Sequence, residues 1–247
     1  MANVDASTYG DRFAGIYDEV HAHLSTPEVV DPMVDVLADL AGGGRALELG
    51  IGTGRIALPL AQRGVEVHGL DASEAMVAKM REKPGGEGIP VTFGDFEQPE
   101  VEGRYSLIYV VFNTLFALPS QEAQVNCFRS VAEHLTDDGA FLIEAFVPDM
   151  TRFDRDQRVS TGIVEHDLVS IDLDRHDPTT QTVASSHIYI TPEGVEMYPV
   201  EIRYAWPSEL DLMARLAGMR LRSRWADWRR NPFTAASTGH VSIYERA

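Results

Sequence analysis

The fold of this chain is decided by one stretch, Ala46-Leu47-Glu48-Leu49-Gly50-Ile51-Gly52-Thr53-Gly54-Arg55. Its first half is small and aliphatic with a single acid, which predicts a buried strand. Glycines then alternate at positions 50, 52 and 54, and glycine lets the backbone take positive φ and lets a ligand touch the chain directly. Apolar residues at helical spacing follow over 55–61, with Pro59 tolerated in the first turn. Strand, glycine turn and helix predict the first unit of an open α/β sheet, where ligands bind beyond the carboxyl ends of the strands.

Two kinds of nucleotide ligand compete for such a turn. A dinucleotide site uses Gly-x-Gly-x-x-Gly and directs a helix N-terminus at a pyrophosphate, whereas here the third glycine comes one residue early. The carboxylate of Glu48 lies two residues before the turn, where it repels phosphate and suits an ammonium group. S-adenosylmethionine carries an ammonium and a sulfonium and no phosphate. A third interpretation, a turn that only lets helix pack on strand, needs one glycine rather than three.

Glu48-Leu-Gly-Ile-Gly-Thr-Gly54 resembles the first motif of class I S-adenosylmethionine-dependent methyltransferases. The resemblance implies that Glu48, Gly50, Gly52 and Arg55 contact the cofactor. It covers residues 45–147 and extends over the remainder only in outline.

Acidic residues end the next two predicted strands. The strand over 65–71 ends in Asp71, whose carboxylate can accept both hydroxyls of a ribose, and that acid would suit NAD equally. Ser73 is a candidate N-cap for a helix over 74–83, which would bring Ala72 and Met76 near an adenine edge.

The strand over 91–96 ends in Asp95-Phe96. The family resemblance implies an acid here that bonds the adenine amino group and an apolar side chain against the ring, so Asp95 and Phe96 are candidates. Either Asp71 or Asp95 alone could simply cap a turn, but both occur at the spacing that the family uses.

A fourth strand over 105–111 leads into Phe112 and Asn113, where the resemblance implies residues that line the methyl donor and acceptor. Asn113 can both donate and accept hydrogen bonds, to the methionine end or to an acceptor group, or it bonds a loop backbone as a buried structural residue. A helix over 120–135 and a strand over 140–146 continue the alternation that is typical of a parallel sheet. We predict an α/β fold with a Rossmann-like, seven-stranded, mostly parallel sheet, helices on both faces and an inserted antiparallel β cap.

Three strand-like segments follow, over 162–172, 182–190 and 195–206, with turns at 177–179 and 191–194. A helix over 207–217 and strands over 220–227 and 241–244 end the chain. We expect a division into an N-terminal helical lid segment (1–44), a cofactor-binding domain (45–159 and 207–247) and a β-meander (160–206) that forms the substrate cap.

The N-terminal segment is rich in aromatic residues over 9–17. It resembles the start of small-molecule N-methyltransferases, including those acting on amino sugars, in which a tyrosine-bearing lid folds over the cofactor. A lid would exclude water and orient the reacting groups, and Tyr9 and Tyr17 are the candidates. Tyrosines at helical spacing can also simply anchor a helix.

Candidate catalytic groups depend on the atom that is methylated. An amine needs only to be neutral, whereas an oxygen nucleophile usually needs a general base within hydrogen-bond reach. His187 has the best position, on a cap strand that we expect to face the pocket, and His166 and His240 are other candidates; any one of them could instead be a structural or exposed histidine. Glu144 could orient an amine, as the strand-end acid of amino-sugar enzymes does, or serve as a buried structural acceptor.

The composition of the chain narrows the choice of methyl acceptor. The formal net charge of −17 repels a polyanion, so we expect a small-molecule acceptor and no nucleic acid. Arg220, Arg222 and Arg224 alternate, which predicts one solvated strand face. The single cysteine, Cys127, excludes a disulfide framework and favours a cytoplasmic protein, and no apolar run is long enough to span a membrane. No metal-ligand spacing occurs, and we expect a monomer or homodimer.

The sequence therefore predicts transfer of a methyl group from S-adenosylmethionine to a nitrogen or oxygen of a small metabolite, by in-line displacement. Two alternatives stay open: an NAD(P)-dependent oxidoreductase, and a non-catalytic methyltransferase-fold binding subunit.

Overall fold

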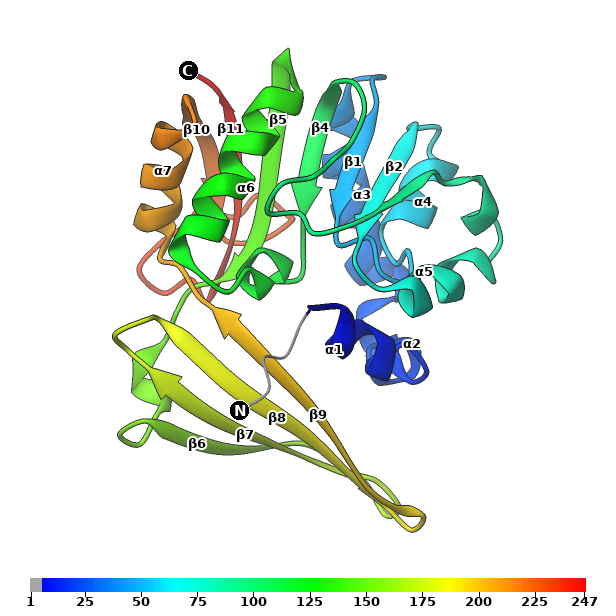
Figure 1. Cartoon of the computed structure of the whole chain (residues 1–247), viewed down its shortest axis with the longest axis vertical. Coiled ribbons are helices and arrows are strands. Elements are labelled where there is room, and N and C mark those ends of the chain that lie inside the picture. Colours follow the sequence, from blue (N-terminus) through cyan, green and yellow to red (C-terminus); the bar gives the residue numbers. More distant parts are fainter. Residues whose placement is uncertain (1–5) are drawn as a thin grey trace.

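The computed structural model describes residues 6–247, with side chains from Gly10 onward, and it contains two β-sheets (Figure 1). The α-helices are α1 (Ala6–Phe13), α2 (Tyr17–Val20), α3 (Pro27–Ala41), α4 (Ala57–Gln62), α5 (Glu74–Arg81), α6 (Gln121–His134) and α7 (Pro207–Leu216). Short 3-10 turns are η1 (Ala22–Leu24), η2 (Gly86–Gly88), η3 (Thr114–Ala117) and η4 (Met150–Arg152). The strands of the larger sheet are β1 (Ala46–Leu49), β2 (Val67–Asp71), β3 (Val91–Phe93), β4 (Tyr105–Val110), β5 (Leu135–Phe146), β10 (Met219–Trp225) and β11 (Gly239–Arg246).

The larger sheet has seven strands in the order β10-β11-β5-β4-β1-β2-β3. Strands β3, β2, β1, β4 and β5 run parallel, and β11 is antiparallel to both β5 and β10. Helices α3, α4 and α5 bury apolar side chains such as Leu37, Leu60 and Val77 against one face, and α6 and α7 bury Phe128 and Met213 against the other. The predicted Rossmann-like α/β fold is confirmed.

Local sequence signals account for where the helices begin. The hydroxyl of Ser73 accepts a hydrogen bond from the Met76 backbone N–H (3.2 Å), so Ser73 is the N-cap of α5 as predicted. Ser120 caps α6 in the same way through the N–H of Ala123 (3.0 Å). Both helices therefore start directly after a strand-end loop, which fixes those loops at the carboxyl edge of the sheet.

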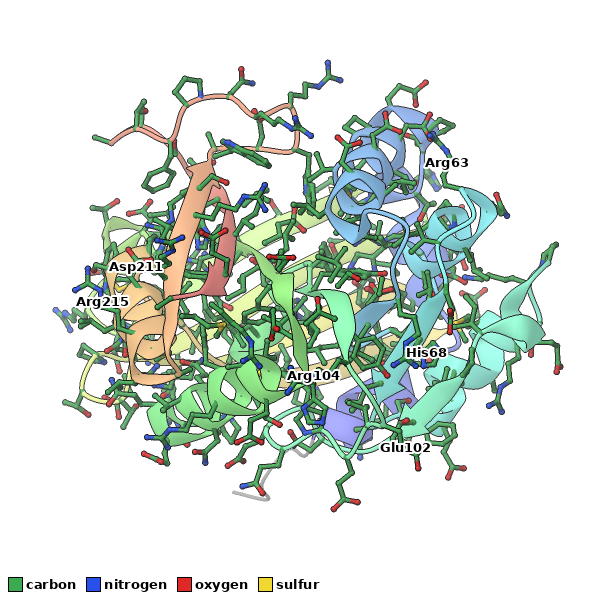
Figure 2. All side chains as sticks on the ribbon, turned by 90° about the horizontal axis from the view of Figure 1, so that it is seen from above. Arg63, His68, Glu102, Arg104, Asp211 and Arg215 are labelled. Atoms are coloured by element: carbon green, nitrogen blue, oxygen red, sulfur yellow. The ribbon has the colours of Figure 1, made fainter. Side chains whose placement is uncertain are left out.

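The second sheet is an antiparallel meander of four strands, β6 (Gln157–Val164), β7 (Val169–Asp177), β8 (Thr182–Thr191) and β9 (Gly194–Arg203). The prediction of three strands was wrong, because the segment 162–172 is broken by a turn at 165–168. There the N–H of Glu165 donates to the carbonyl of Leu168 (2.9 Å). Figure 1 shows this sheet beyond the carboxyl ends of the parallel strands. Figure 2 shows the opposite end, where Glu102 and Arg104 lie just before β4.

The three alternating arginines of β10 do not share one face. Pairing with β11 shifts between Leu221 and Ser223, and this bulge turns Arg224 to the other side of the sheet. Arg220 and Arg222 form exposed ion pairs with Glu245, as predicted for a solvated face. Arg224 is only 10% exposed and binds Asp211 at 2.7 Å, so the prediction of a shared solvated face was wrong for it.

Candidate functional site

A cavity of about 410 Å³ lies at the carboxyl edge of the seven-stranded sheet, between that edge, the N-terminal helices and the four-stranded sheet β6–β9, which is called the cap below for its place over that edge. Eight of the predicted cofactor residues line it: Tyr17, Gly50, Gly52, Asp71, Ala72, Met76, Phe96 and Phe112. Two predicted catalytic residues, Asn113 and His187, line it as well. Glu48, Arg55, Asp95 and Glu144 are not among its lining residues. The side chain of Tyr9 lies outside the described residues, so its assignment to the lid stays a prediction.

The glycine turn forms one wall. Gly50 and Gly52 have φ of +74° and +54°, a conformation that favours glycine. A Cβ at Gly50 would lie 2.6 Å from the Thr114 side chain, whereas a Cβ at Gly52 would meet no protein atom within 4 Å. The open space beside Gly52 is therefore where a ligand can approach the bare backbone.

Asp71 is held in place at the end of β2 by backbone donors. The Gly52 N–H donates to Oδ2 (2.7 Å) and the Ser73 N–H to Oδ1 (2.8 Å). Each carboxylate oxygen keeps a further lone pair, which suits the two hydroxyls of a ribose. Burial raises the pKa of Asp71 even though these N–H groups favour the ionised form.

Glu48 lies beneath the turn rather than on the cavity wall. It is 3% exposed, and its Oε2 accepts the Tyr109 hydroxyl proton at 3.0 Å. Burial raises the pKa of Glu48 to about 8, against the opposing effects of Tyr109 and Arg55. A carboxyl group with this pKa is largely protonated at neutral pH, so Glu48 acts as a buried hydrogen-bonding group beneath the turn rather than as a charge on the cavity wall.

The N-terminal helices are attached to the turn by polar contacts. Asp18 accepts the hydroxyl proton of Thr53 (2.7 Å) and forms an ion pair with Lys83 (2.6 Å). The Ser73 hydroxyl donates to Asp11 (2.6 Å), so α1 packs against the start of α5. These contacts hold Tyr17 at the cavity, where burial raises the pKa of its phenol.

The same segment also contacts the cap. Phe13 is 1% exposed, and its ring centroid lies 4.9 Å from that of Tyr198 on β9. The aromatic cluster continues through Tyr17, whose ring lies 4.5 Å from that of His21. His21 in turn lies edge-on to Phe112 at 5.3 Å. The N-terminal segment therefore bridges the glycine turn and the cap.

The loop after β4 is fixed by two polar side chains. Phe112 and Asn113 both have positive φ, +58° and +62°. Glu144 accepts from the Phe112 N–H (2.9 Å) and from the Trp228 indole N–H (2.8 Å), so each of its oxygens accepts one hydrogen bond. The Asn113 carbonyl oxygen accepts from the Phe146 N–H (2.7 Å). Glu144 therefore fixes the backbone at Phe112, and Asn113 attaches the loop to the end of β5. The Arg55 guanidinium carbon lies 5.0 Å from the centroid of the Phe112 ring.

The cap supplies a histidine–aspartate pair. His187 on β8 and Asp172 on β7 are register partners, and the His187 Nδ1 lies 2.7 Å from the Asp172 Oδ1. Both side chains are about one-third exposed, at 33% and 35%, and both line the cavity. An aspartate on Nδ1 fixes the tautomer that leaves Nε2 as a proton acceptor. His187 was predicted from the sequence and Asp172 was not, because their pairing depends on the register of two strands.

The other candidates lie elsewhere. Asp95 is exposed, and its carboxylate accepts a hydrogen bond from the Glu97 N–H (2.6 Å). Asp95 lines a separate surface hollow, whereas its neighbour Phe96 lines the main cavity. His166 is 97% exposed beside Asp167. His240 is 1% exposed within the sheet, where burial lowers its pKa to about 4.

Further lining residues were not singled out from the sequence: Gly10, Thr114, Ala117, Phe146, Arg152, Arg158, Asp174, Ser185, Val200, Glu201 and Ile202. Within residues 6–247 no group of three or more His, Cys, Asp or Glu side chains is arranged to hold a metal ion. No helix in that range has the length and apolar character needed to cross a bilayer.

Comparisons with known proteins identify the family that this site suggests. A family model described as a methyltransferase domain matches residues 46–139. The cypemycin N-terminal methyltransferase of Streptomyces sp is 26% identical, over 98% of this chain and 99% of that protein.

Solved structures are similar over nearly the whole chain. The CcbJ methyltransferase from Streptomyces caelestis is 39% identical, over 98% of this chain and 99% of that one, with a TM-score of 0.92. S-adenosylmethionine-bound CalS10, an amino pentose methyltransferase from Micromonospora echinaspora, is 16% identical, over 94% and 97%, with a TM-score of 0.71, and indicates the fold alone.

Proposed function

We propose that this chain methylates an amine nitrogen of a small molecule. The premise is that the chain belongs to the class I S-adenosylmethionine-dependent methyltransferases. The chain is an enzyme whose cofactor is S-adenosylmethionine. The observation that carries the proposal is a single cavity that joins the glycine turn and Asp71 to the His187–Asp172 pair.

The residues of the turn fit this cofactor better than a dinucleotide. Asp71 would hold the ribose hydroxyls, and Met76 and Phe96 would flank the adenine. The bare backbone at Gly52 leaves room for the amino-acid end. When bound, S-adenosylmethionine supplies an electrophilic methyl group on its sulfonium. Asp95 at the adenine amino group stays a prediction.

His187 would make the acceptor reactive. A protonated amine has no lone pair, so it must lose a proton before its nitrogen can attack. Among the described residues Nε2 of His187 has no hydrogen-bond partner, while Nδ1 is bonded to Asp172, so Nε2 can take that proton. Asp172 orients the ring through this contact. Phe112, held by Glu144, would set the approach of the acceptor, and the Tyr17 segment would exclude water.

Nitrogen is preferred to oxygen as the acceptor atom for one reason. One relative that matches this chain over nearly its full length, at 26% identity, is named an N-terminal methyltransferase, and an N-terminus is an amine. The His187–Asp172 pair would serve an alcohol or phenol acceptor equally well, so the two acceptor types must be compared directly.

The test is methyl transfer to a panel of amines and of matched alcohols, followed by mass spectrometry. We expect amines to gain one methyl group and His187→Ala to lower kcat about 100-fold, the size expected for loss of a general base. His166→Ala is the matched control, since His166 also bonds a neighbouring aspartate but is 97% exposed. Transfer to alcohols alone would contradict the nitrogen assignment, and equal rates in both variants would contradict the role of His187.

The proposal extends to the organisation of the chain. Residues 1–44 would act as the lid, residues 45–159 and 207–247 as the cofactor-binding domain, and residues 160–206 as the substrate cap. The single cysteine supports a cytoplasmic location, and the net charge of −17 supports an acceptor other than nucleic acid. A monomer or homodimer is the proposed assembly.

A further inference from the structure

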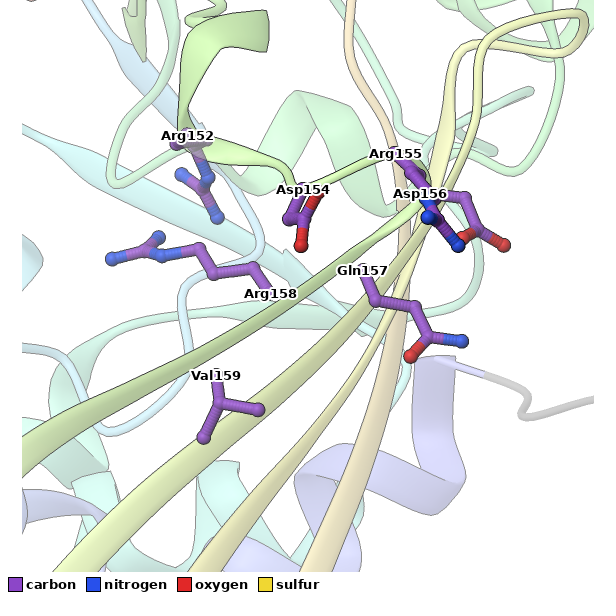
Figure 3. Close-up of a pocket in the computed structure, with 7 residues that line it drawn as sticks. All are labelled: Arg152, Asp154, Arg155, Asp156, Gln157, Arg158 and Val159. Carbon is purple, nitrogen blue, oxygen red and sulfur yellow. The ribbon is translucent and has the colours of Figure 1, made fainter.

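Arg152 at the end of η4 and Arg158 on β6 converge on one buried carboxylate at the cavity wall. Arg152 lies 3.1 Å and Arg158 lies 3.8 Å from the same oxygen, Oδ2 of Asp174. Asp174 is 5% exposed in its side chain, and its other oxygen accepts the Ser185 hydroxyl proton at 2.6 Å. Both arginines also line a neighbouring hollow, and Figure 3 shows their guanidinium groups extending to the same side of it.

The cluster holds more positive charge than Asp174 neutralises. Arg158 is 32% exposed, and within residues 6–247 it makes no hydrogen bond besides its long ion pair, so its five N–H donors are available. Two guanidinium groups face the one carboxylate of Asp174, so the donors of Arg158 are not used up by that contact. A half-enclosed arginine with free donors at the wall of a substrate cavity is suited to bind an oxyanion of the substrate.

We propose that Arg158, supported by Arg152, binds a carboxylate of the methyl acceptor, so that the acceptor is an amine that also bears a carboxylate. A carboxylate matches the planar fork of one guanidinium, which can donate two parallel N–H groups to it. A dianion such as a phosphate would be repelled about twice as strongly as a carboxylate by Asp174, Asp172 and Glu201, which all line this wall.

The cluster lies close to the proposed reaction centre. Asp174 pairs with Ser185, and Asp172 pairs with His187 one step along the same face of the same two strands. Two residues along a strand span about 7 Å, so the Asp174 and His187 positions are separated by roughly that distance. One small acceptor can therefore reach both, with its amine toward His187 and its carboxylate toward Arg158.

This inference rests on the proposed function, and a binding measurement tests the carboxylate site separately from methyl transfer. The probes are 4-(aminomethyl)benzoate, its carboxamide and 4-(aminomethyl)phenylphosphonate, titrated into the protein saturated with S-adenosylhomocysteine and followed by ligand-observed NMR. We expect the benzoate to bind at least tenfold more tightly than the carboxamide and the phosphonate. Arg158→Gln should remove this preference, and Arg158→Lys should keep part of it because the charge remains.

Arg155→Gln is the matched control. It removes the same charge three residues away, from an exposed side chain that lines the neighbouring hollow but not the cavity, and Figure 3 shows it directed away from Arg152 and Arg158. An unchanged Kd for S-adenosylhomocysteine in every variant shows that the fold is intact. Equal binding of benzoate and carboxamide, absence of binding by all three probes, or equal loss in Arg155→Gln would overturn the inference. Failure to methylate any amine while the benzoate preference persists would contradict only the proposed function.

Discussion

Single residues show how burial changes the chemistry of polar groups in this chain. His240 on β11 is 1% exposed, its Nδ1 bonds the Ser242 hydroxyl at 2.8 Å, and its Nε2 has no partner among the described residues. Burial lowers the pKa of His240 from 6.5 to about 4, with Arg224 adding to the effect. The folded protein therefore prefers the neutral ring.

The stability of the fold should depend on pH through this residue. Between pH 6.5 and about 4 the unfolded chain binds a proton at His240 that the folded chain does not, so this contribution to stability is present above pH 6.5 and is lost as the pH falls. On lowering the pH from 7 to 5, the wild type should lose about 2 kcal/mol more unfolding free energy than His240→Asn. Urea unfolding at both pH values measures the difference. His166→Asn, at the 97% exposed histidine, should follow the wild type, and a constant gap between the wild type and His240→Asn would contradict this account.

At the scale of elements, α2 is attached to the glycine turn by Asp18. Its carboxylate binds both the Thr53 hydroxyl and the Lys83 ammonium, and its neighbour Tyr17 lines the cavity. If residues before α3 form a lid, Asp18→Asn should weaken its closure, because it removes one ion pair and weakens one hydrogen bond. We expect S-adenosylhomocysteine to dissociate about fivefold faster, which corresponds to about 1 kcal/mol.

Stopped-flow displacement measures that dissociation rate. Glu19→Gln is the control, since it removes the same charge from the next position, whose side chain is exposed. An unchanged rate in Asp18→Asn would argue that α2 is an anchored helix rather than a lid.

Elements with local signals were predictable, and those set by distant pairing were not. Ser73 caps α5 as predicted, because an N-cap needs only the hydroxyl and the next three residues. The turn at 165–168 was missed, because Glu-His-Asp-Leu contains no glycine or proline to mark it. Arg224 was placed on the wrong face, because a bulge opposite β11 leaves no mark in the sequence.

The candidate site shows the same distinction between residues predictable from local sequence and residues placed by distant pairing. The residues near the glycine turn follow a local motif, and eight of the twelve predicted cofactor residues line the cavity. The acceptor side depends on the register of β7 against β8, which brings Asp172 to His187 and Asp174 to Ser185. Residues 15 positions apart, such as Asp172 and His187, carry no spacing signal, so only the folded cap shows them as a pair.

At the scale of the whole molecule, the cavity is assembled from three parts of the chain. The central sheet contributes Asp71, the N-terminal helices contribute Tyr17 and the cap contributes His187. Such an arrangement can hold a cofactor and an acceptor side by side and exclude water from between them. The account therefore depends above all on what binds beside Asp71.

The most direct test is calorimetric titration of the protein with S-adenosylhomocysteine, with NADH titrated in parallel. We expect micromolar binding of S-adenosylhomocysteine alone, weakened about 100-fold or more in Asp71→Ala because the ribose loses two charge-assisted hydrogen bonds. Asp137→Ala, whose native carboxylate is 89% exposed at the other end of the sheet, should bind as the wild type does. Binding of NADH instead, or equal binding by wild type and Asp71→Ala, would contradict the assignment of this cavity.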